Sequence, residues 1–249
     1  MNKNILVIGA TSEIGNEVNK LFALKGSRFV LIGRDSIKIE EHKNELLNLG
    51  SKDVEGLVDD LVLTENKEGL FNKALIFLNY KIDIVFINYA SLENQDLLEN
   101  RISEAVKNLN TNFVSAAEWS LITGNYFDKS DGKLIFLSSV AAERGRRSNY
   151  IYGASKSGMN ILIEGLSNRF AYKNSFFVSL KLGVVKTKMS SDIEGLSKLL
   201  AIDPSTIAKK IYKIANLKKP KTFYLLPKIW IIIMFLIKLL PNKVLFNIK

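Results

Sequence analysis

Short apolar runs alternate along this chain with longer stretches in which apolar residues recur every three or four positions. The apolar runs lie at residues 5–8, 29–32, 82–87, 133–137 and 176–182. Runs of this length are typical of buried strands, and the stretches between them are typical of amphipathic helices. Such alternation builds a parallel sheet covered on both faces. We therefore predict a single α/β domain with a Rossmann-like, doubly wound parallel sheet, in which ligands bind beyond the carboxyl ends of the strands.

The pattern changes near the C-terminus, where residues 229–237 are apolar on every side of a helix. A helix between Pro227 and Pro241 would be roughly 20 Å long, which is shorter than the roughly 30 Å hydrocarbon core of a bilayer. We expect it to lie in the membrane interface; packing on the body of the protein or in an oligomer interface is the alternative. The predicted organisation is a main domain over residues 1–221 and a C-terminal segment over residues 222–249.

Composition and charge narrow the function. The 249 residues are 47% hydrophobic and include no cysteine and one histidine, His42, so we expect a globular protein without a metal site. Asp203 is the last acid, and the ten lysines that follow it match the whole net charge of +10. Basic segments attract anionic membranes or nucleic acid. The interleaved apolar residues favour a membrane over nucleic acid, with a solvated lysine-rich tail as the plain alternative.

The N-terminus fixes the expected compartment. Its first apolar run is four residues long and leads directly into Gly9, which does not fit a signal peptide. We therefore expect a cytoplasmic protein that is peripheral at the inner face of the membrane.

A glycine-containing turn, Gly9 to Gly15, follows the first strand and precedes a helix pattern. Glycines let the backbone approach a pyrophosphate, whose charge is favoured by the N-terminus of the following helix. The alternative is an ordinary strand-to-helix turn. We expect the following residues to bind a dinucleotide: Gly9, Thr11, Ser12, Ile14 and Gly15.

The end of the second strand predicts the cofactor. An acid at this point accepts the ribose hydroxyls of NAD, whereas an arginine suits the 2′-phosphate of NADP. Arg34 therefore indicates NADPH/NADP, although Asp35 is adjacent. After the third strand, a carboxylate could accept a hydrogen bond from the adenine amino group. Helix phase favours Asp60 over Asp59 for this contact, and we expect the next residue, Leu61, to contact the cofactor as well.

The strongest chemical signal is Tyr152 with Lys156, preceded by Ser139 at the end of an apolar strand. Residues four apart share one helix face. A tyrosine has a pKa of about 10, and a neighbouring cation can lower it by up to ~3 units. We expect Lys156 to do this, while Ser139 holds a carbonyl oxygen that Tyr152 protonates as nicotinamide delivers hydride. Taken alone, the tyrosine and lysine would be an ordinary helix face.

These residues together resemble the short-chain dehydrogenase/reductase family over residues 4–190. The resemblance implies that Ser139, Tyr152 and Lys156 are the catalytic triad, that Tyr152 and Lys156 also contact the cofactor, and that Asn112 serves the proton relay. It further implies cofactor contacts by Asn88, Ala90, Gly183, Val185 and Thr187. It also implies a homo-oligomer formed through the helix that begins near Tyr152.

Three positions depart from the family pattern: Glu13 and Ser91 stand for glycines, and Leu182 stands for a proline. An acid beside a pyrophosphate is unfavourable unless its side chain points away. Glu13 therefore puts the cofactor geometry in question, but not the fold.

A narrower resemblance, to the decaprenylphosphoryl-2-keto-ribose reductases, covers residues 138–147, 150–156, 186–190 and the tail from Tyr224. Those enzymes carry a similar Thr-Ser-Glu-Ile-Gly turn. The resemblance implies a keto sugar on polyprenyl phosphate as substrate, cell-envelope glycan synthesis as the setting, and a flavin oxidase as partner.

The loop between Ser139 and Tyr152 contains Arg144, Arg146 and Arg147, which could pair with a substrate phosphate. A solvated loop is the alternative. Two other functions stay open: reduction of a soluble carbonyl, such as a 3-ketoacyl thioester or a small ketone, and NADPH sensing without turnover.

Overall fold

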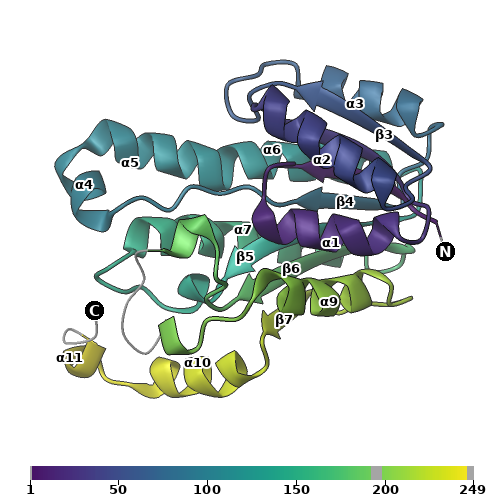
Figure 1. Ribbon diagram of the computed structural model, residues 1–249. Helices are drawn as coiled ribbons and strands as arrows, with labels where there is room; N and C mark the ends of the chain where they lie inside the picture. Colours follow the sequence, from purple (N-terminus) through teal and green to yellow (C-terminus); the bar gives the residue numbers. More distant parts are fainter. Residues whose placement is uncertain (1, 192–197, 246–249) are drawn as a thin grey trace.

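One seven-stranded sheet organises the molecule. The computed structural model describes residues 2–191 and 198–245. All paired strands are parallel, in the order β3-β2-β1-β4-β5-β6-β7 (Figure 1). The strands are β1 (Asn4–Ile8), β2 (Arg28–Gly33), β3 (Asp53–Val58), β4 (Ile84–Ile87), β5 (Gly132–Ser139), β6 (Ser175–Leu182) and β7 (Phe223–Leu226). The predicted Rossmann-like, doubly wound parallel sheet is confirmed.

Helices cover both faces of the sheet. The α-helices are α1 (Glu13–Ala23), α2 (Ser36–Asn48), α3 (Lys67–Phe77), α4 (Gln95–Asn100), α5 (Ile102–Leu109), α6 (Ser115–Phe127), α7 (Tyr150–Arg169), α9 (Pro204–Ala215), α10 (Ile229–Leu239) and α11 (Asn242–Leu245). A π-helical turn, η1 (Asn110–Val114), joins α5 to α6, and two 3-10 turns, η2 (Val140–Glu143) and η3 (Lys188–Ser190), follow β5 and β6.

Alternating side chains of each strand reach opposite cores. In β1, Ile5 and Val7 pack with α1, α2 and α9, whereas Leu6 and Ile8 pack with α3, α6 and α7. All four side chains are fully buried. A strand buried on both faces shows a continuous apolar run because successive residues point to opposite sides. This is why the runs predicted the strands.

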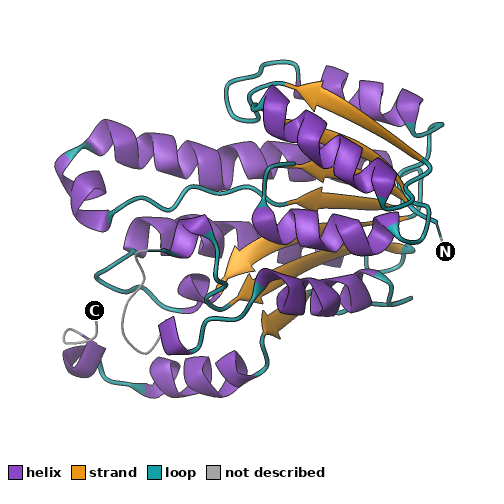
Figure 2. Ribbon diagram, in the orientation of Figure 1, coloured by secondary structure: helices purple, strands orange, loops and turns teal. Residues whose placement is uncertain are grey.

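The carboxyl ends of the strands meet at one edge of the sheet, toward which the arrowheads in Figure 2 point. The turn after β1, Arg34 after β2, Asp60 after β3, Asn88 after β4 and Ser139 at the end of β5 therefore lie at the same edge. Parallel topology thus gathers residues that are far apart in the chain.

The sheet extends past the predicted domain boundary at residue 221. β7 pairs with β6 in a register that runs from Ser179–Phe223 to Leu182–Leu226. The beginning of the predicted C-terminal segment therefore belongs to the main domain. Sequence reasoning missed β7 because residues 222–249 were assigned as a whole to the C-terminal segment. Residues 246–249, the end of the predicted segment, lie outside the described residues.

The predicted apolar helix is present as α10, and its two sides differ. Trp230 and Met234 are buried against Val140 of η2. Lys238 forms an ion pair with Glu143, and Arg144 donates to the carbonyl oxygens of Ile237 and Lys238. One side therefore packs on the body of the protein, as the alternative had it. Within the described residues, no helix has the length and apolar character needed to cross a membrane.

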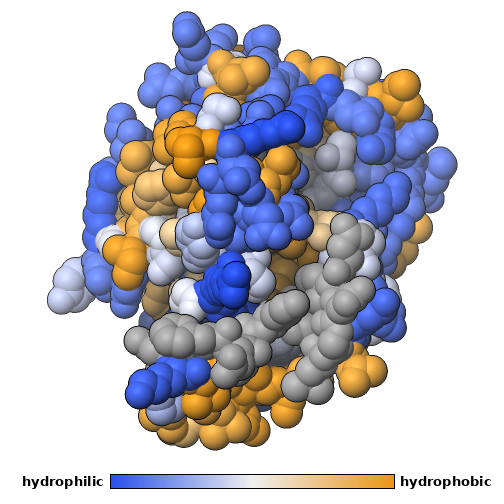
Figure 3. Space-filling model, turned by 90° about the vertical axis from the view of Figure 1, so that its left-hand side faces the viewer, coloured by the Kyte–Doolittle hydropathy of each residue, from blue (hydrophilic) through white to orange (hydrophobic). Residues whose placement is uncertain are grey.

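The other side of α10 is an exposed apolar surface, visible along the lower edge of Figure 3. We call it the outer face; it consists of Ile229, Ile231, Ile232, Phe235, Leu236 and Leu239, each about half exposed or more. Because the inner residues recur at helical spacing, the apolar residues between them are left facing solvent.

Candidate active site

A cleft of about 1180 Å³ lies at the carboxyl edge of the sheet. Its lining includes these predicted residues: Gly9, Thr11, Ser12, Ile14, Arg34, Asp60, Leu61, Asn88, Ala90, Ser139, Arg146, Tyr152, Lys156, Gly183, Val185 and Thr187. Four predicted residues lie outside the lining: Gly15, Asn112, Arg144 and Arg147.

The turn after β1 requires glycine for reasons of space. Gly9 has φ +95°, and a Cβ there would lie 2.8 Å from both the backbone nitrogen and the Cβ of Tyr89. Gly15 packs against the amide of Asn88, where a Cβ would overlap it, so Gly15 shapes the turn from behind the cleft. Ser12 caps α1 by accepting from the Gly15 N–H at 3.2 Å. The positive end of α1 thus lies beside the cleft, as an anionic pyrophosphate requires.

Glu13 is directed toward the opposite wall of the cleft. Its carboxylate accepts a hydrogen bond from the backbone N–H of Lys188 at 2.9 Å. Glu13, which departs from the family pattern, therefore has a hydrogen-bond partner in η3. This bond explains how an acid is accommodated at the turn.

The two residues after β2 have separate roles. Arg34 is exposed and lines the cleft. Asp35 caps α2, accepting from the Lys38 N–H at 3.1 Å, and pairs with the Lys38 ammonium at 3.3 Å. Asp35 is therefore engaged outside the cleft lining, and Arg34 is the residue that faces the site.

Asp60 is fixed by the backbone of its own loop. One carboxylate oxygen accepts from the N–H groups of Leu63, at 3.0 Å, and Val62, at 2.8 Å. These bonds, led by that of Leu63, lower the pKa of Asp60, and the nearby charge of Arg34 adds to the effect. Asp60 is therefore an ionised group facing the end of the cleft where Arg34 lies.

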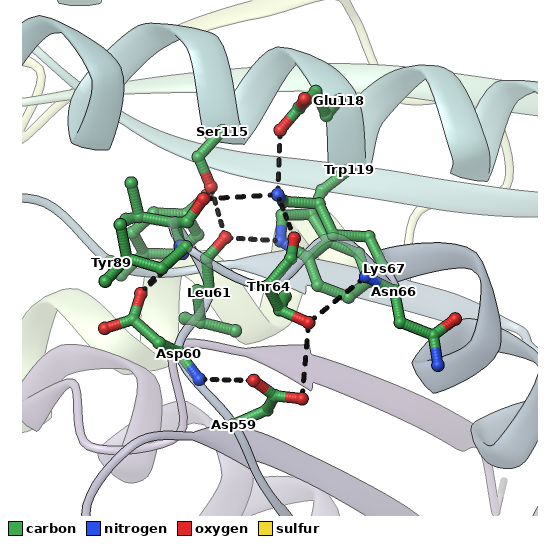
Figure 4. A network of polar contacts seen from close by, with 12 residues as sticks. Asp59, Asp60, Leu61, Thr64, Asn66, Lys67, Tyr89, Ser115, Glu118 and Trp119 are labelled. Atoms are coloured by element: carbon green, nitrogen blue, oxygen red, sulfur yellow. Dashed lines mark hydrogen bonds and ion pairs between the residues drawn. The ribbon is translucent and has the colours of Figure 1, made fainter.

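A polar network ties this loop to α6 (Figure 4). The Leu61 carbonyl accepts from the Ser115 hydroxyl at 2.5 Å and from the indole of Trp119 at 3.3 Å, and the Tyr89 hydroxyl lies 2.7 Å from Ser115. Lys67, which is 8% exposed, forms a 2.9 Å ion pair with Glu118 of α6. The network holds the loop in place before any ligand binds. Sequence reasoning missed it because its members come from three separate segments.

Two asparagines near the turn after β4 differ in their hydrogen bonding: Asn88 of the turn has an unpaired amide, and Asn112 of η1 has a paired one. Asn88 is 8% exposed, and neither atom of its amide has a hydrogen-bond partner among the described residues. Buried amides usually have partners, so this one is available to a bound group. Asn112 instead clasps Ser91: it accepts from the Ser91 N–H and donates to the Ser91 carbonyl, both at 2.7 Å. Its side chain positions the turn, and its relay role stays a prediction.

Ser139, Tyr152 and Lys156 converge in the cleft as predicted. The Ser139 hydroxyl accepts from the Ala141 N–H at 3.1 Å, and it lies close enough to Tyr152 to act on the pKa of the tyrosine. Lys156 is 1% exposed; its ammonium donates to the Leu137 carbonyl at 3.0 Å and lies 5.8 Å from the Tyr152 ring centroid. α7 places the tyrosine and lysine on one face, and β5 delivers the serine to them.

The expected electrostatic effect on the tyrosine is not observed in the protein without ligand. Burial raises the pKa of Tyr152 to about 12, against a smaller lowering by Ser139. Burial also lowers the pKa of Lys156 to about 7. Desolvation disfavours the charged form of each group. Tyr152 is consequently protonated at neutral pH, which is the state that a proton donor needs.

Trp230 of α10 is a cleft residue that sequence reasoning missed. It is 3% exposed, and its indole N–H has no hydrogen-bond partner among the described residues. A Cβ at position 183 would overlap the indole nitrogen, so the glycine after β6 is required by a residue 47 positions later. Only the tertiary packing of α10 could have revealed this contact.

The three predicted substrate arginines separate. Arg146 lines the cleft, Arg147 is exposed outside its lining, and Arg144 holds the C-terminal end of α10. The grouping of three arginines around one phosphate is therefore wrong for Arg144, whose guanidinium donates to backbone carbonyls. Sequence adjacency did not give spatial adjacency because the loop turns between them.

These residues fit a nicotinamide dinucleotide. The open amide of Asn88, the glycine turn and the start of α1 offer contacts for it, and the segment from Gly183 to Thr187 completes the cleft. When bound, the nicotinamide accepts or supplies the hydride. Ser139 is placed to hold a substrate oxygen, and Tyr152 is placed to donate or remove its proton. The arrangement suits the interconversion of a ketone and a secondary alcohol.

Comparison with known proteins agrees. The profile of the short chain dehydrogenase family matches residues 3–195. An uncharacterized oxidoreductase of Streptomyces coelicolor is 30% identical over 67% of this chain and 66% of its own length. A hydroxysteroid 11-beta-dehydrogenase 1-like protein of Xenopus tropicalis is 26% identical over 70% of this chain and 60% of its own length. An 11-beta-hydroxysteroid dehydrogenase-like protein of Arabidopsis thaliana is 25% identical over 95% of this chain and 77% of its own length.

The matched region thus covers less than two thirds of the first two relatives. Fold, glycine turn, converging triad and family profile all agree, and the chain belongs to the short-chain dehydrogenase/reductase family of NAD(P)-dependent oxidoreductases.

Proposed function

We propose that this enzyme uses NADPH to reduce a ketone to a secondary alcohol on a keto sugar carried by polyprenyl phosphate, in cell-envelope glycan synthesis. The observation that carries the substrate class is the placement of α10. Its inner face puts Trp230 into the cleft, while its outer face exposes six apolar side chains. The site thus lies beside an apolar surface, which suits a sugar whose lipid stays in a membrane.

The choice of NADPH rests on Arg34. A guanidinium in the cleft favours a 2′-phosphate, and the neighbouring acid, Asp35, is engaged in capping α2. The proposal therefore assigns Arg34 to the adenosine end of the cofactor.

The outer face of α10 and the nearby lysines support membrane association. Lys228 and Lys243 are exposed at the two ends of this region. Apolar side chains bury at the boundary between headgroups and acyl chains, and lysines attract anionic lipids, by about 1 kcal/mol each. We propose that the enzyme sits at the inner face of the membrane, where a flavin oxidase supplies the keto sugar, and that it is a homo-oligomer.

The test of the reaction is NADPH oxidation by the full chain in detergent, with a polyprenyl-phosphate 2-keto-pentose made by a flavin oxidase. Turnover by the wild type, its loss in Tyr152→Phe and its retention in Tyr150→Phe would support the proposal. Turnover of a soluble ketone but not of the lipid-linked sugar would keep the reductase and reject the substrate class.

The membrane is tested separately by flotation with vesicles that contain anionic lipid. Ile232→Gln combined with Phe235→Gln removes apolar contacts from the outer face while leaving Trp230 and Met234 in place. We expect this variant to leave the vesicle fraction. Ile76→Gln, at an exposed apolar residue of α3, is the matched control and should float like the wild type. Equal flotation of all three proteins would reject membrane docking through α10.

A further inference from the structure

Arg146 is a half-buried cation in the cleft whose charge is not balanced. Burial lowers its pKa. Its Nε atom is buried without a hydrogen-bond partner, and the guanidinium forms no ion pair with the described residues. The acid nearest in sequence, Glu143, is already held by Lys181 and Lys238.

A half-buried arginine without an ion pair favours the binding of an anion. Removing a charge from water costs several kcal/mol unless it is paired and hydrogen-bonded. Arg144 and Arg147 show the two ordinary outcomes for the same loop, since one binds backbone carbonyls and the other stays in solvent. Arg146 neither binds a backbone carbonyl of the described residues nor stays fully in solvent, and it lines the cleft.

Asn149 supplies a second polar group in the same turn. Its backbone N–H donates to the Arg146 carbonyl at 3.2 Å, so the two residues are held together. Asn149 lines the cleft, its side-chain oxygen is buried without a partner among the described residues, and its side chain makes no capping bond to α7. An amide can present either its oxygen or its N–H groups to a ligand. The 20-residue helix α7 begins at the next residue, so its positive N-terminal end lies beside Asn149.

We propose that Arg146 and Asn149 form an anion subsite that binds a phosphoryl group of the substrate. The planar fork of an arginine matches phosphate oxygens, and the amide and helix N-terminus add donors of the kind that phosphate accepts. Asn149 precedes Tyr152 by three residues, a rise of about 5 Å along the helix. The subsite therefore lies within about one helical turn of the proposed proton donor.

This inference rests on the proposed function, since it assigns a place to the phosphate of that substrate. It predicts that phosphate esters compete with a neutral ketone for the cleft, and do not compete with NADPH. The shared chemistry is a phosphate ester, which a phosphorylated sugar or a lipid phosphate could provide.

The experiment measures inhibition of butanedione reduction by the full chain at saturating NADPH. Ribose 5-phosphate and dodecyl phosphate, the latter below its micellar concentration, are the two inhibitors. We expect Arg146→Gln to raise the inhibition constant at least tenfold more than it raises the KM for butanedione, and Arg146→Lys to recover part of the loss. The control Arg147→Gln, in the same loop but outside the cleft lining, should retain the wild-type inhibition constant.

Calorimetric titration of the same esters into the NADP-saturated proteins gives a readout that does not need turnover. It separates failure of the subsite from failure of the proposed reaction, because a protein without ketone reductase activity can still bind the ester through Arg146. Equal affinity of wild type and Arg146→Gln, or equal losses in Arg146→Gln and Arg147→Gln, would overturn the subsite. Tighter binding of dodecyl phosphate assigns the phosphate to a lipid, and tighter binding of ribose 5-phosphate assigns it to the sugar.

Discussion

The carboxylate of Glu13 accepts a hydrogen bond from the backbone N–H of Lys188, 175 positions later in the chain. Glu13 begins α1, and Lys188 begins η3 directly after Thr187. The bond therefore joins two walls of the cleft. It gives a physical reason for an acid at a position where the family pattern has glycine.

We predict opposite effects for two substitutions of Glu13. Glu13→Ala removes the acceptor and should weaken NADPH binding several-fold, since one such bond contributes about 1 kcal/mol. Glu13→Gln keeps an acceptor but removes a negative charge near the pyrophosphate, so its affinity should equal or exceed that of the wild type. Dissociation constants from cofactor fluorescence test this. Weakening by Glu13→Gln to the same extent as by Glu13→Ala would contradict the account.

Tyr152→Phe should lower kcat for ketone reduction by about 10²-fold or more, because it removes the proton donor. Tyr150→Phe alters an exposed tyrosine of the same helix and should not. Because the pKa of Tyr152 is raised to about 12, the donor is fully protonated between pH 6 and pH 9. The rate of reduction should show no loss of activity from tyrosine ionisation in that range. A titration of this donor near neutral pH would contradict the raised pKa of Tyr152.

Arg34→Ser should raise the KM for NADPH by about tenfold or more, because a charge-assisted contact to the 2′-phosphate contributes about 1.5–3 kcal/mol. NADH lacks that phosphate, so its KM serves as the internal control and should change little. Steady-state kinetics with both cofactors test the assignment. Equal increases for NADPH and NADH would assign Arg34 to general positioning.

Lys156→Met should stabilise the protein without ligand while destroying its activity. The pKa of Lys156 is about 7 in the folded protein, below its ordinary value of 10.5. Between these values the unfolded chain binds more protons, so wild-type stability is lowest at and below pH 7 and rises toward pH 10.5. The variant's advantage in thermal midpoint should therefore be largest near pH 6 and shrink by pH 10. A constant advantage across that range would rule out desolvation as its cause.

Glu143→Gln should loosen α10. Lys181 and Lys238 pair with Glu143 and lower its pKa, against the opposing effect of burial. The contribution of Glu143 to stability is present above its unfolded pKa and is lost as pH falls through its lower folded pKa. At neutral pH the variant should shift Trp230 fluorescence toward that of an exposed indole, and in the wild type a similar shift should need strong acid. Lys238→Gln should have a smaller effect, because Lys181 still pairs with Glu143.

Much of the site could be predicted from the sequence because its residues occupy fixed places relative to strands. Gly9 follows β1, Arg34 follows β2, and Ser139 ends β5, so a parallel sheet brings them to one edge. The four-residue spacing of Tyr152 and Lys156 likewise places them on one helix face. These placements depend only on the nearest strand or helix, so they could be predicted without knowledge of the tertiary contacts.

Other features depend on contacts between segments that are far apart in the chain, and the sequence of one segment does not indicate its contacts with another. Asp35 and Arg34 are neighbours, yet capping of α2 engages one and leaves the other in the cleft. Arg144, Arg146 and Arg147 look equivalent in sequence, and the packing of α10 gives them different surroundings. No periodicity or spacing could have separated them.

The sequence by itself determined the parallel α/β fold, the family, the serine, tyrosine and lysine of the candidate active site, and an apolar helix near the C-terminus. Tertiary structure alone decided that β7 completes the sheet, that Trp230 enters the cleft against Gly183, and that burial dominates the pKa values of Tyr152 and Lys156. The physical reason is range: propensity and periodicity act over a few residues, whereas desolvation and packing depend on every segment that folds around a site.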